Sequence, residues 1–99
     1  MTIKLFITKS SRPQKYDLLD EKREYILSFG DNRYEDYTIH KEYDRKKRYI
    51  NRHAKNEDWH KSGLYTAGWA SRWILWNLPT IKDSIRDANH RFNLDIKLI

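Results

Sequence analysis

The sequence predicts a small α+β protein in which an N-terminal antiparallel sheet packs on about three helices, with a tryptophan-rich helix at the centre. The pattern of apolar residues supports this fold class, because they alternate near the N-terminus, recur at helical spacing in the middle, and alternate again at the C-terminus. The 99 residues suffice for one domain with one modest core. We therefore divide a single domain, residues 1–99, into a sheet region (1–29), a helical region (41–92) and a possible last strand (94–99).

The first strands are predicted from alternation and from a polar loop. Ile3, Leu5 and Ile7 share one side of the stretch TIKLFIT, at the period of a half-buried strand. The residues SSRP then interrupt the pattern. Residues 15–19 and 23–29 flank the polar tetrad DEKR, which suits a hairpin loop. We therefore expect the N-terminal third to form a small antiparallel sheet.

A connection and a basic helix are predicted next. Residues 30–40 are rich in Gly, Asp and Asn and show no sustained period, so we expect a loop. The following stretch KEYDRKKRYINRHAK lacks Gly and Pro. Glu42 and Asp44 lie in its first turn and Arg52 and Lys55 in its last, as the helix dipole favours. The residues expected near one face of this helix are Ile39, Tyr43, Lys47, Ile50 and Ala54.

The segment TAGWASRWILW is predicted to be a buried helix. Trp69, Trp73 and Trp76 are spaced i, i+4, i+7, so a continuous helix would place all three rings on one stripe. A helix that is apolar over most of its surface is normally buried. The alternative is an exposed platform that stacks bases or grips a peptide. We favour core packing, and the predicted core residues are Trp69, Trp73, Trp76, Ile74, Ile81, Ile85 and Phe92.

Another helix and a last strand are predicted after the tryptophan segment. Pro79 cannot continue a helix, and it biases the preceding residue away from helical geometry. Thr80 followed by Asp83 resembles a capping box, and apolar residues then recur at helical spacing up to Phe92. The final LDIKLI alternates as a strand does. We expect it to join the N-terminal sheet, and the alternative is a tail that docks elsewhere.

Composition limits the class of function. The net charge of +6 and the pI near 9.6 favour acidic partners, namely nucleic acid, anionic lipid or an acidic protein face. The absence of Cys excludes disulfides, thiolate zinc sites and Cys nucleophiles. No apolar run approaches the roughly 18 residues of a membrane span, and the N-terminal apolar stretch is too short for a signal peptide. We therefore expect a soluble protein that is not secreted.

The densest basic run is the candidate binding surface for nucleic acid or another acidic partner. Arg45, Arg48 and Arg52 fall at i, i+3, i+7, so a helix would form a stripe able to lie along phosphates. The alternative is a solvated helix face whose long stems cover apolar surface. The candidate contact residues are Arg45, Lys46, Arg48, Tyr49, Arg52 and Lys55.

The four histidines do not predict a metal site. His40, His53, His60 and His90 form no HExxH motif and no pair at i, i+4. Acid–base catalysis by His53 or His60 with Glu57 stays open, but the sequence offers no partner for a nucleophile or an oxyanion. We therefore expect a non-enzymatic protein with no metal, no cofactor and no small-molecule substrate.

Four segments of the sequence carry a family resemblance. They are DYTIH at 36–40, RKKRYINRH at 45–53, NEDW at 56–59 and TAGWASRWILWNLPTIKDSI at 66–85. Together they resemble a family of short uncharacterised proteins encoded by large nucleocytoplasmic DNA viruses of the chlorovirus, mimivirus and iridovirus kind. That family has no established activity, so the resemblance implies no catalytic or binding residue. It implies a context, namely a virion or a virus factory in the host cytoplasm, with viral DNA and capsid proteins as the available partners.

These observations lead to two hypotheses of function. The first is a structural or capsid-associated component of a viral particle, a minor capsid protein for example, which binds other virion proteins. The second is a nucleic-acid-binding protein with little base specificity that uses the basic helix at 45–55. A large apolar patch on the folded monomer would favour the first, and an exposed basic stripe next to Tyr49 would favour the second.

Overall fold

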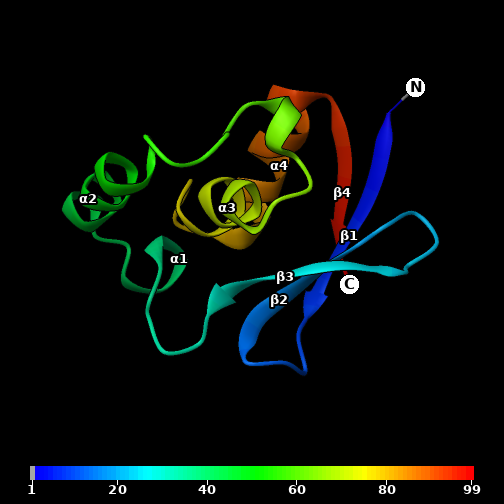
Figure 1. The fold of residues 1–99 in the computed structure, drawn as a ribbon, viewed down its shortest axis with the longest axis horizontal. Coiled ribbons are helices and arrows are strands. Elements are labelled where there is room, and N and C mark those ends of the chain that lie inside the picture. Colours follow the sequence, from blue (N-terminus) through cyan, green and yellow to red (C-terminus); the bar gives the residue numbers. More distant parts are fainter. Residues whose placement is uncertain (1) are drawn as a thin grey trace.

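The computed structural model describes residues 2–99 and shows a four-stranded sheet with helices packed against it (Figure 1). The strands are β1 (Ile3–Lys9), β2 (Gln14–Leu19), β3 (Tyr25–Asp31) and β4 (Leu94–Leu98). The α-helices are α1 (Tyr37–His40), α2 (Tyr43–His53), α3 (Ala67–Ala70) and α4 (Ile81–Phe92). Two further turns are η1 (Lys61–Gly63), a 3₁₀ turn, and η2 (Ser71–Leu75), a π-helical turn. This arrangement confirms the predicted α+β fold.

The sheet joins the beginning of the described chain to its end. Its strand order is β3-β2-β1-β4, with antiparallel pairing within β1, β2 and β3. Strand β4 runs parallel to β1, with Leu5 opposite Ile96. Parallel neighbours need a long crossover connection, which the helical region supplies here. The last strand therefore joins the N-terminal sheet as the alternation predicts, and the completed sheet is mixed.

The loop between β2 and β3 is built by Asp20. Its carboxylate accepts hydrogen bonds from the backbone N–H groups of Lys22 and Glu24, each at 2.9 Å. Its carbonyl oxygen accepts from Arg23 N at 2.9 Å, and Arg23 itself has a φ of 64°. An Asp that bonds the backbone two residues on is a common way to close a turn. The polar tetrad DEKR thus forms the loop of the predicted hairpin.

The hydrophobic core lies between one face of the sheet and the helices. The strands contribute the buried side chains Leu5, Ile7, Leu18, Phe29, Leu94 and Ile96, and the helical region contributes Leu64, Trp69, Ala70, Trp73, Ile74, Leu75, Ile85 and Ala88. Of the remaining predicted core residues, Trp76, Ile81 and Phe92 are partly buried and pack against this cluster. The large rings therefore do supply much of the core of this small protein.

The tryptophan segment differs from the continuous helix that its spacing predicts. Helix α3 ends at Ala70 and passes into η2, where Trp76 N donates to Ser71 O at 3.0 Å, a bond between residues i and i+5. A π-helical turn holds more residues per turn than an α-helix, so it displaces whatever follows from the α-helical stripe. The stripe expectation is therefore wrong for Trp76.

The three tryptophan rings consequently have different neighbours. The rings of Trp69 and Trp73 each lie 5.2 Å from the ring of Phe92, measured between centroids. The indole of Trp76 instead stacks on Tyr49 of α2. Trp69 and Trp73 thus pack in the core beside α4, and the π-helical turn directs Trp76 toward α2.

The connection at residues 30–40 contains the short helix α1, which the sequence analysis did not predict. The Asp36 carboxylate accepts from Thr38 N at 2.8 Å and so caps the start of this helix. Lys41 ends the helix with a left-handed φ of 56°, and its backbone N–H donates to Tyr37 O. One capping Asp and one left-handed residue are enough to form a single turn without any apolar periodicity.

Helix α4 follows the predicted cap and leads directly into β4. Thr80 Oγ1 accepts from Asp83 N at 3.1 Å, and Asn93 ends the helix with a φ of 55°. The side-chain amide of Asn89 then bonds both backbone groups of Ile96, at 2.8 and 3.1 Å. These contacts fix where the chain turns from α4 into the sheet. Among residues 2–99, no helix is long and apolar enough to cross a membrane.

Helix α2 lies at one side of the molecule, beyond α3 as seen from the sheet (Figure 1). Its one buried residue is Tyr49. The helix face that the sequence predicts does not pack inward as a whole, because two of its residues, Ile39 and Tyr43, are 52% and 61% exposed. The large ring of Tyr49 finds an aromatic neighbour in Trp76, and this contact, not the aliphatic pattern, decides which side of α2 packs inward.

Candidate functional site

Helix α2 and the residues that follow it carry the densest run of basic side chains. Residues 45–56 contain six Lys and Arg and no acid. Arg45, Arg48 and Arg52 lie at i, i+3, i+7 of α2 and therefore share one side of it. All three line the same small hollow of about 200 Å³ beside Tyr34. We call these three residues the arginine face.

The arginine face is neutralised at only one end. Arg45 forms ion pairs with Glu42 at 3.2 Å and with Glu35 at 4.0 Å. Arg48 and Arg52 are exposed, and within residues 2–99 neither has a carboxylate within 4.0 Å. Two guanidinium groups one turn apart are thus available to an external anion.

The other basic residues near α2 lie in different settings. Lys46 points inward, where its Nζ donates to Asn77 O at 2.5 Å and lies 5.1 Å from the centre of the Tyr37 ring. Burial lowers the pKa of Lys46, since it penalises the charged form, and the hydrogen bond to Asn77 O offsets part of that penalty. Lys55 follows the end of α2 and is exposed. Lys46 therefore tethers the helix, whereas Lys55 extends the basic surface.

Tyr49 also belongs to the inner side of α2. Its side chain is 7% exposed, and its ring lies parallel to that of Trp76. Its ring centroid is 4.5 Å from that of His53. Burial raises the pKa of the Tyr49 hydroxyl, so the group stays protonated. Of the six predicted contact residues, Lys46 and Tyr49 thus hold α2 in place, and Arg45, Arg48, Arg52 and Lys55 face outward.

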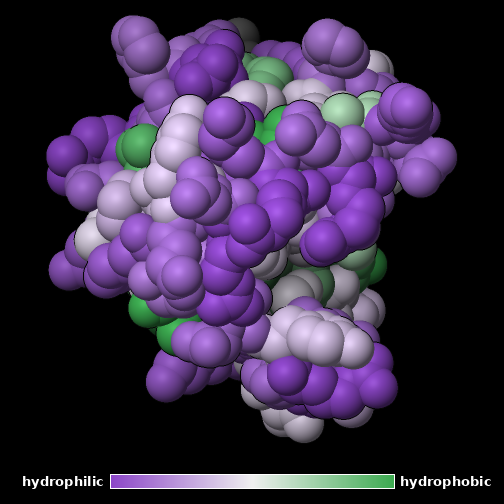
Figure 2. All heavy atoms as spheres, turned by 90° about the vertical axis from the view of Figure 1, so that its left-hand side faces the viewer, coloured by the Kyte–Doolittle hydropathy of each residue, from purple (hydrophilic) through white to green (hydrophobic). Residues whose placement is uncertain are grey.

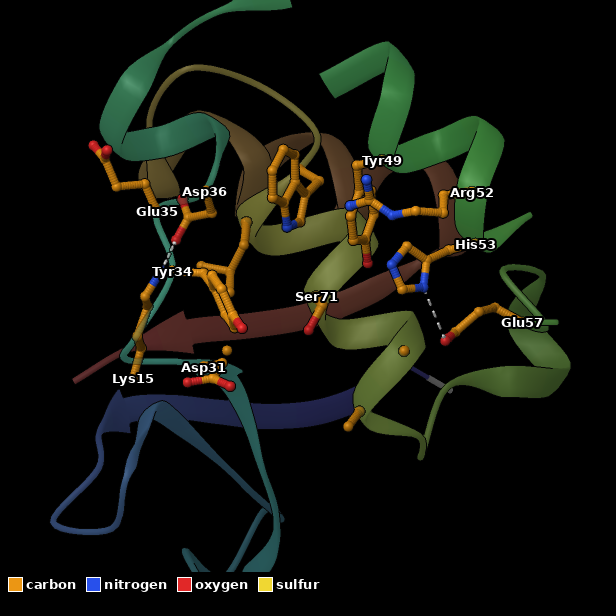
Figure 3. Close-up of a pocket in the computed structure, with 15 residues that line it drawn as sticks. Lys15, Asp31, Tyr34, Glu35, Asp36, Tyr49, Arg52, His53, Glu57 and Ser71 are labelled. Carbon is orange, nitrogen blue, oxygen red and sulfur yellow. Dashed lines mark hydrogen bonds and ion pairs between the residues drawn. The ribbon is translucent and has the colours of Figure 1, made fainter. Parts of the chain in front are cut away.

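A larger cavity of about 490 Å³ lies between α2, the loop after β3, and the α3–η2 segment (Figure 3). This volume falls in the range of about 300 to 1,000 Å³ that is typical of small-ligand sites. Three aromatic side chains, Tyr34, Tyr49 and Trp76, contribute to its walls. The other lining residues are Lys15, Gly30, Asp31, Glu35, Asp36, Arg52, His53, Glu57, Ala67, Gly68, Ser71 and Leu75.

Two ion pairs flank the cavity from opposite sides (Figure 3). Lys15 Nζ bonds Asp36 Oδ2 at 2.7 Å, and both side chains are largely buried. On the other side, His53 Nδ1 lies 3.8 Å from Glu57 Oε1. Because Lys15 is matched by Asp36 and His53 faces Glu57, Arg52 is the lining cation that has no acidic partner within residues 2–99.

Asp31 adds a carboxylate at the sheet end of the cavity. Arg33 donates to it from Nε and Nη2, and these hydrogen bonds lower the pKa of Asp31 to about 2. The carboxylate is therefore ionised at neutral pH.

Two hydroxyl groups face the cavity without partners. Figure 3 shows Ser71 between Tyr34 on one side and Tyr49 on the other, with the oxygens of Ser71 and Tyr49 directed toward the open space. Within the part of the chain that is described, neither hydroxyl forms a hydrogen bond. Each can donate to and accept from a bound molecule.

The cavity and the arginine hollow are continuous. Tyr34, Glu35, Arg52 and Trp76 line both of them. Figure 2 views the molecule from the side of α2, and there hydrophilic side chains surround a recess with paler, less polar atoms inside. Positive charge at the rim and aromatic surface within are thus combined in one site.

The histidines are dispersed in the structure as well. No group of three or more His, Cys, Asp or Glu within residues 2–99 is arranged to hold a metal ion. His53 pairs with Glu57 at the cavity, while His60 and His90 are exposed. His40 Nδ1 accepts from Glu42 N at 2.9 Å, and its buried Nε2 has no partner among the described residues.

Several residues of this site had no signal in the sequence. Lys15, the pair Tyr34 and Asp36, and Ser71 come from three separate segments, and the fold brings them to one cavity. Only the basic run was visible beforehand, because a helical spacing places its arginines on one side. The π-helical turn points the Trp76 side chain away from the stripe of Trp69 and Trp73. No pattern of residues in the sequence predicts that turn.

Comparison with known proteins gives one match. No curated protein and no solved structure matches the chain significantly. Residues 6–53 match the model of a family of unknown function, DUF5754. This region runs from β1 to the end of α2 and includes the whole arginine face. The chain thus contains, over nearly half of its length, a region similar to an uncharacterised domain.

Proposed function

We propose that this protein binds nucleic acid through the phosphate backbone, with the arginine face as the contact surface. The observation that carries the proposal is the pair Arg48 and Arg52, which are exposed, one helical turn apart, and unmatched by any acid among residues 2–99. Guanidinium groups bind phosphates with bidentate geometry, and such contacts supply most of the non-specific affinity for DNA. The net charge of +6 favours the encounter.

The distribution of exposed apolar side chains favours this proposal over a protein interface built on a broad apolar patch. Apart from the neighbours Leu98 and Ile99, the large exposed apolar side chains come from separate parts of the chain; they are Tyr25, Tyr34, Ile39, Tyr43 and Tyr65. Single exposed apolar residues are normal on a soluble surface, whereas a contact patch is contiguous. The face that holds α2 is largely hydrophilic (Figure 2).

The proposal is tested by binding of the purified protein to labelled DNA across a salt series. We expect micromolar affinity at low salt, and a plot of log K against log salt with a slope of about −2 to −3, since each phosphate contact contributes about 0.9. Both duplex and single-stranded DNA of unrelated sequence are measured. Absence of binding at low salt, or an affinity that does not change with salt, would contradict the proposal.

A structural role in a virion is the second candidate, in keeping with the resemblance to proteins of large DNA viruses. It is supported by β4, an edge strand of the sheet, which within residues 2–99 pairs with β1 on one side and with no strand on the other. Leu98 and Ile99, at the end of this edge, are 42% and 47% exposed. An open edge strand is a template for pairing with another chain.

This second candidate has its own measurement. The mass in solution is recorded over a range of protein concentrations for the native chain and for Leu98→Lys. The candidate predicts reversible self-association that the charged substitution removes. A mass that stays monomeric at every concentration would count against assembly through this edge.

A further inference from the structure

The arginine face explains binding of phosphates, but it leaves the adjoining cavity without a ligand. We infer that it receives one unpaired nucleobase of a single strand whose phosphates lie on Arg48 and Arg52. The inference rests on the proposed function and deepens it, because it turns a general backbone contact into a preference for unpaired nucleic acid.

The first argument is the continuity of the two hollows. Arg52 lines both the hollow of about 200 Å³ and the cavity of about 490 Å³, and so do Tyr34 and Trp76. A phosphate held by Arg52 therefore lies at the rim of the cavity. In a nucleotide the base is attached to that same phosphate through one sugar, so the adjoining space is where a base would reach.

The second argument is the aromatic wall. Tyr34 is 67% exposed although it lines the cavity, and the partly buried Trp76 lies on the boundary of the two hollows. The Arg33 guanidinium carbon lies 5.6 Å from the centre of the Tyr34 ring, and most of the ring stays open to solvent. Aromatic side chains beside a basic groove are the usual stacking platform for single-stranded nucleic acid.

The third argument is the chemistry of the lining. Lys15 is neutralised by Asp36 and His53 faces Glu57, so the interior offers no surplus positive charge for a second phosphate. It offers hydrogen-bonding groups instead, since the hydroxyls of Ser71 and Tyr49 have no partners within residues 2–99. A neutral, planar ring with donors and acceptors on its edge is the complement of such a lining.

A paired base cannot occupy this cavity without leaving its helix. Extruding a base from a duplex costs unstacking and unpairing energy, whereas an unpaired base avoids most of that cost. The inference therefore predicts tighter binding to single-stranded than to duplex DNA at equal salt.

The decisive probe is a short single-stranded DNA compared with a strand of the same length in which every base is replaced by an abasic site. The phosphate backbone is the same in both, so the difference reports the bases alone. We expect the native protein to bind the base-containing strand at least about tenfold more tightly, the usual scale of one aromatic stacking contact. Equal affinity for both strands would overturn the inference.

A matched pair of variants locates the effect. Tyr34→Ala removes the exposed cavity wall, and Tyr43→Ala removes an equally exposed ring, at 67% and 61% exposure, from α2. Tyr43 lies two residues before Arg45 and therefore on nearly the opposite side of the helix from the arginine face. We expect Tyr34→Ala to reduce the preference for the base-containing strand to about twofold or less and Tyr43→Ala to keep it. A preference that survives Tyr34→Ala unchanged would overturn the assignment to this cavity.

The two proposals fail in different ways. If neither strand binds at low salt, the proposed function and this inference both fall. If both strands bind equally and with a salt-dependent affinity, the arginine contact stands and only the base cavity is refuted.

Discussion

The ring of Tyr49 lies parallel to the indole of Trp76, with 4.3 Å between their centroids and 2° between their planes. This stack joins α2 to the end of η2, and Tyr49 is the one buried residue of the helix. The position of the arginine face relative to the cavity therefore depends on this contact together with the hydrogen bond from Lys46 to Asn77 O.

Removing the stack is expected to free α2 from the rest of the molecule. Tyr49→Ala should lower the free energy of unfolding by about 3 kcal/mol, the usual scale for truncating a buried aromatic side chain. Tyr49→Phe keeps the ring and, because the hydroxyl has no partner within residues 2–99, should change stability by less than about 1 kcal/mol. Urea denaturation followed by tryptophan fluorescence measures the free energy of unfolding of both variants. Equal losses in the two variants would show that the ring contact is not what holds α2.

The buried ion pair between Lys15 and Asp36 is expected to be sensitive to loss of one partner. Asp36→Ala leaves the Lys15 ammonium unpaired at a largely buried position and also removes the cap of α1. Breaking such a pair costs about 3 to 5 kcal/mol. Lys15→Met with Asp36→Leu removes both charges and should cost less than Asp36→Ala alone. The thermal unfolding temperatures of the two variants measure the difference. A double variant that unfolds at a lower temperature than Asp36→Ala would contradict the prediction that an unpaired Lys15 is the main cost.

Two glycines offer a matched test of packing. A Cβ at Gly63 would overlap the backbone carbonyl of Asp58, which cannot move without shifting the chain. A Cβ at Gly68 would overlap the Glu57 carboxylate, the far end of a flexible side chain. Gly63→Ala should therefore destabilise by about 1 to 3 kcal/mol, and Gly68→Ala by less than about 1 kcal/mol. The urea midpoints of the two variants measure these losses of stability. A larger loss for Gly68→Ala than for Gly63→Ala would contradict the packing described at these positions.

The partly buried setting of His40 predicts a pH dependence with a definite sign. Burial first, and then the charge of Arg45, lowers the pKa of His40 below its ordinary value of 6.5. Protonation would also break the hydrogen bond that Nδ1 accepts from Glu42 N. Below pH 6.5 the unfolded chain therefore binds more protons at this residue than the folded one. The contribution of His40 to stability is complete above that pH and declines as the pH falls toward the folded-state pKa.

This prediction is checked by an NMR titration of the imidazole nitrogens. We expect the native His40 to titrate below the value that the same residue shows in urea, with the proton of the neutral form on Nε2. A native midpoint at or above the unfolded one would contradict the burial argument.

The sequence predicts most of the sheet and α4 because their patterns are local. Ile3, Leu5 and Ile7 recur at a period of two in β1, and Thr80 with Asp83 marks a helix start that the structure contains. The course of the chain at Trp76 could not be predicted in this way. A π-helical turn arises from the packing of the whole segment between α2 and α4, not from the spacing of its tryptophans.

The candidate site shows the same division. The arginine face follows from the i, i+3, i+7 spacing of three residues on one helix. The cavity needs Lys15 from β2, Tyr34 from the loop after β3, and Ser71 from η2. These residues are neighbours only after the chain has folded, and a single sequence holds no record of their proximity.

The central claim is that Arg48 and Arg52 contact phosphates, and the salt dependence of DNA binding tests it most directly. The double variant Arg48→Ala/Arg52→Ala is compared with Lys82→Ala/Arg86→Ala, which removes the same charge from exposed positions on α4. For duplex DNA we predict that the first variant lowers the magnitude of the slope of log K against log salt by about 1.8, two contacts at about 0.9 each, while the second leaves it nearly unchanged. Equal slopes for the two variants would show that the affinity reflects net charge alone and would contradict the assignment of the arginine face.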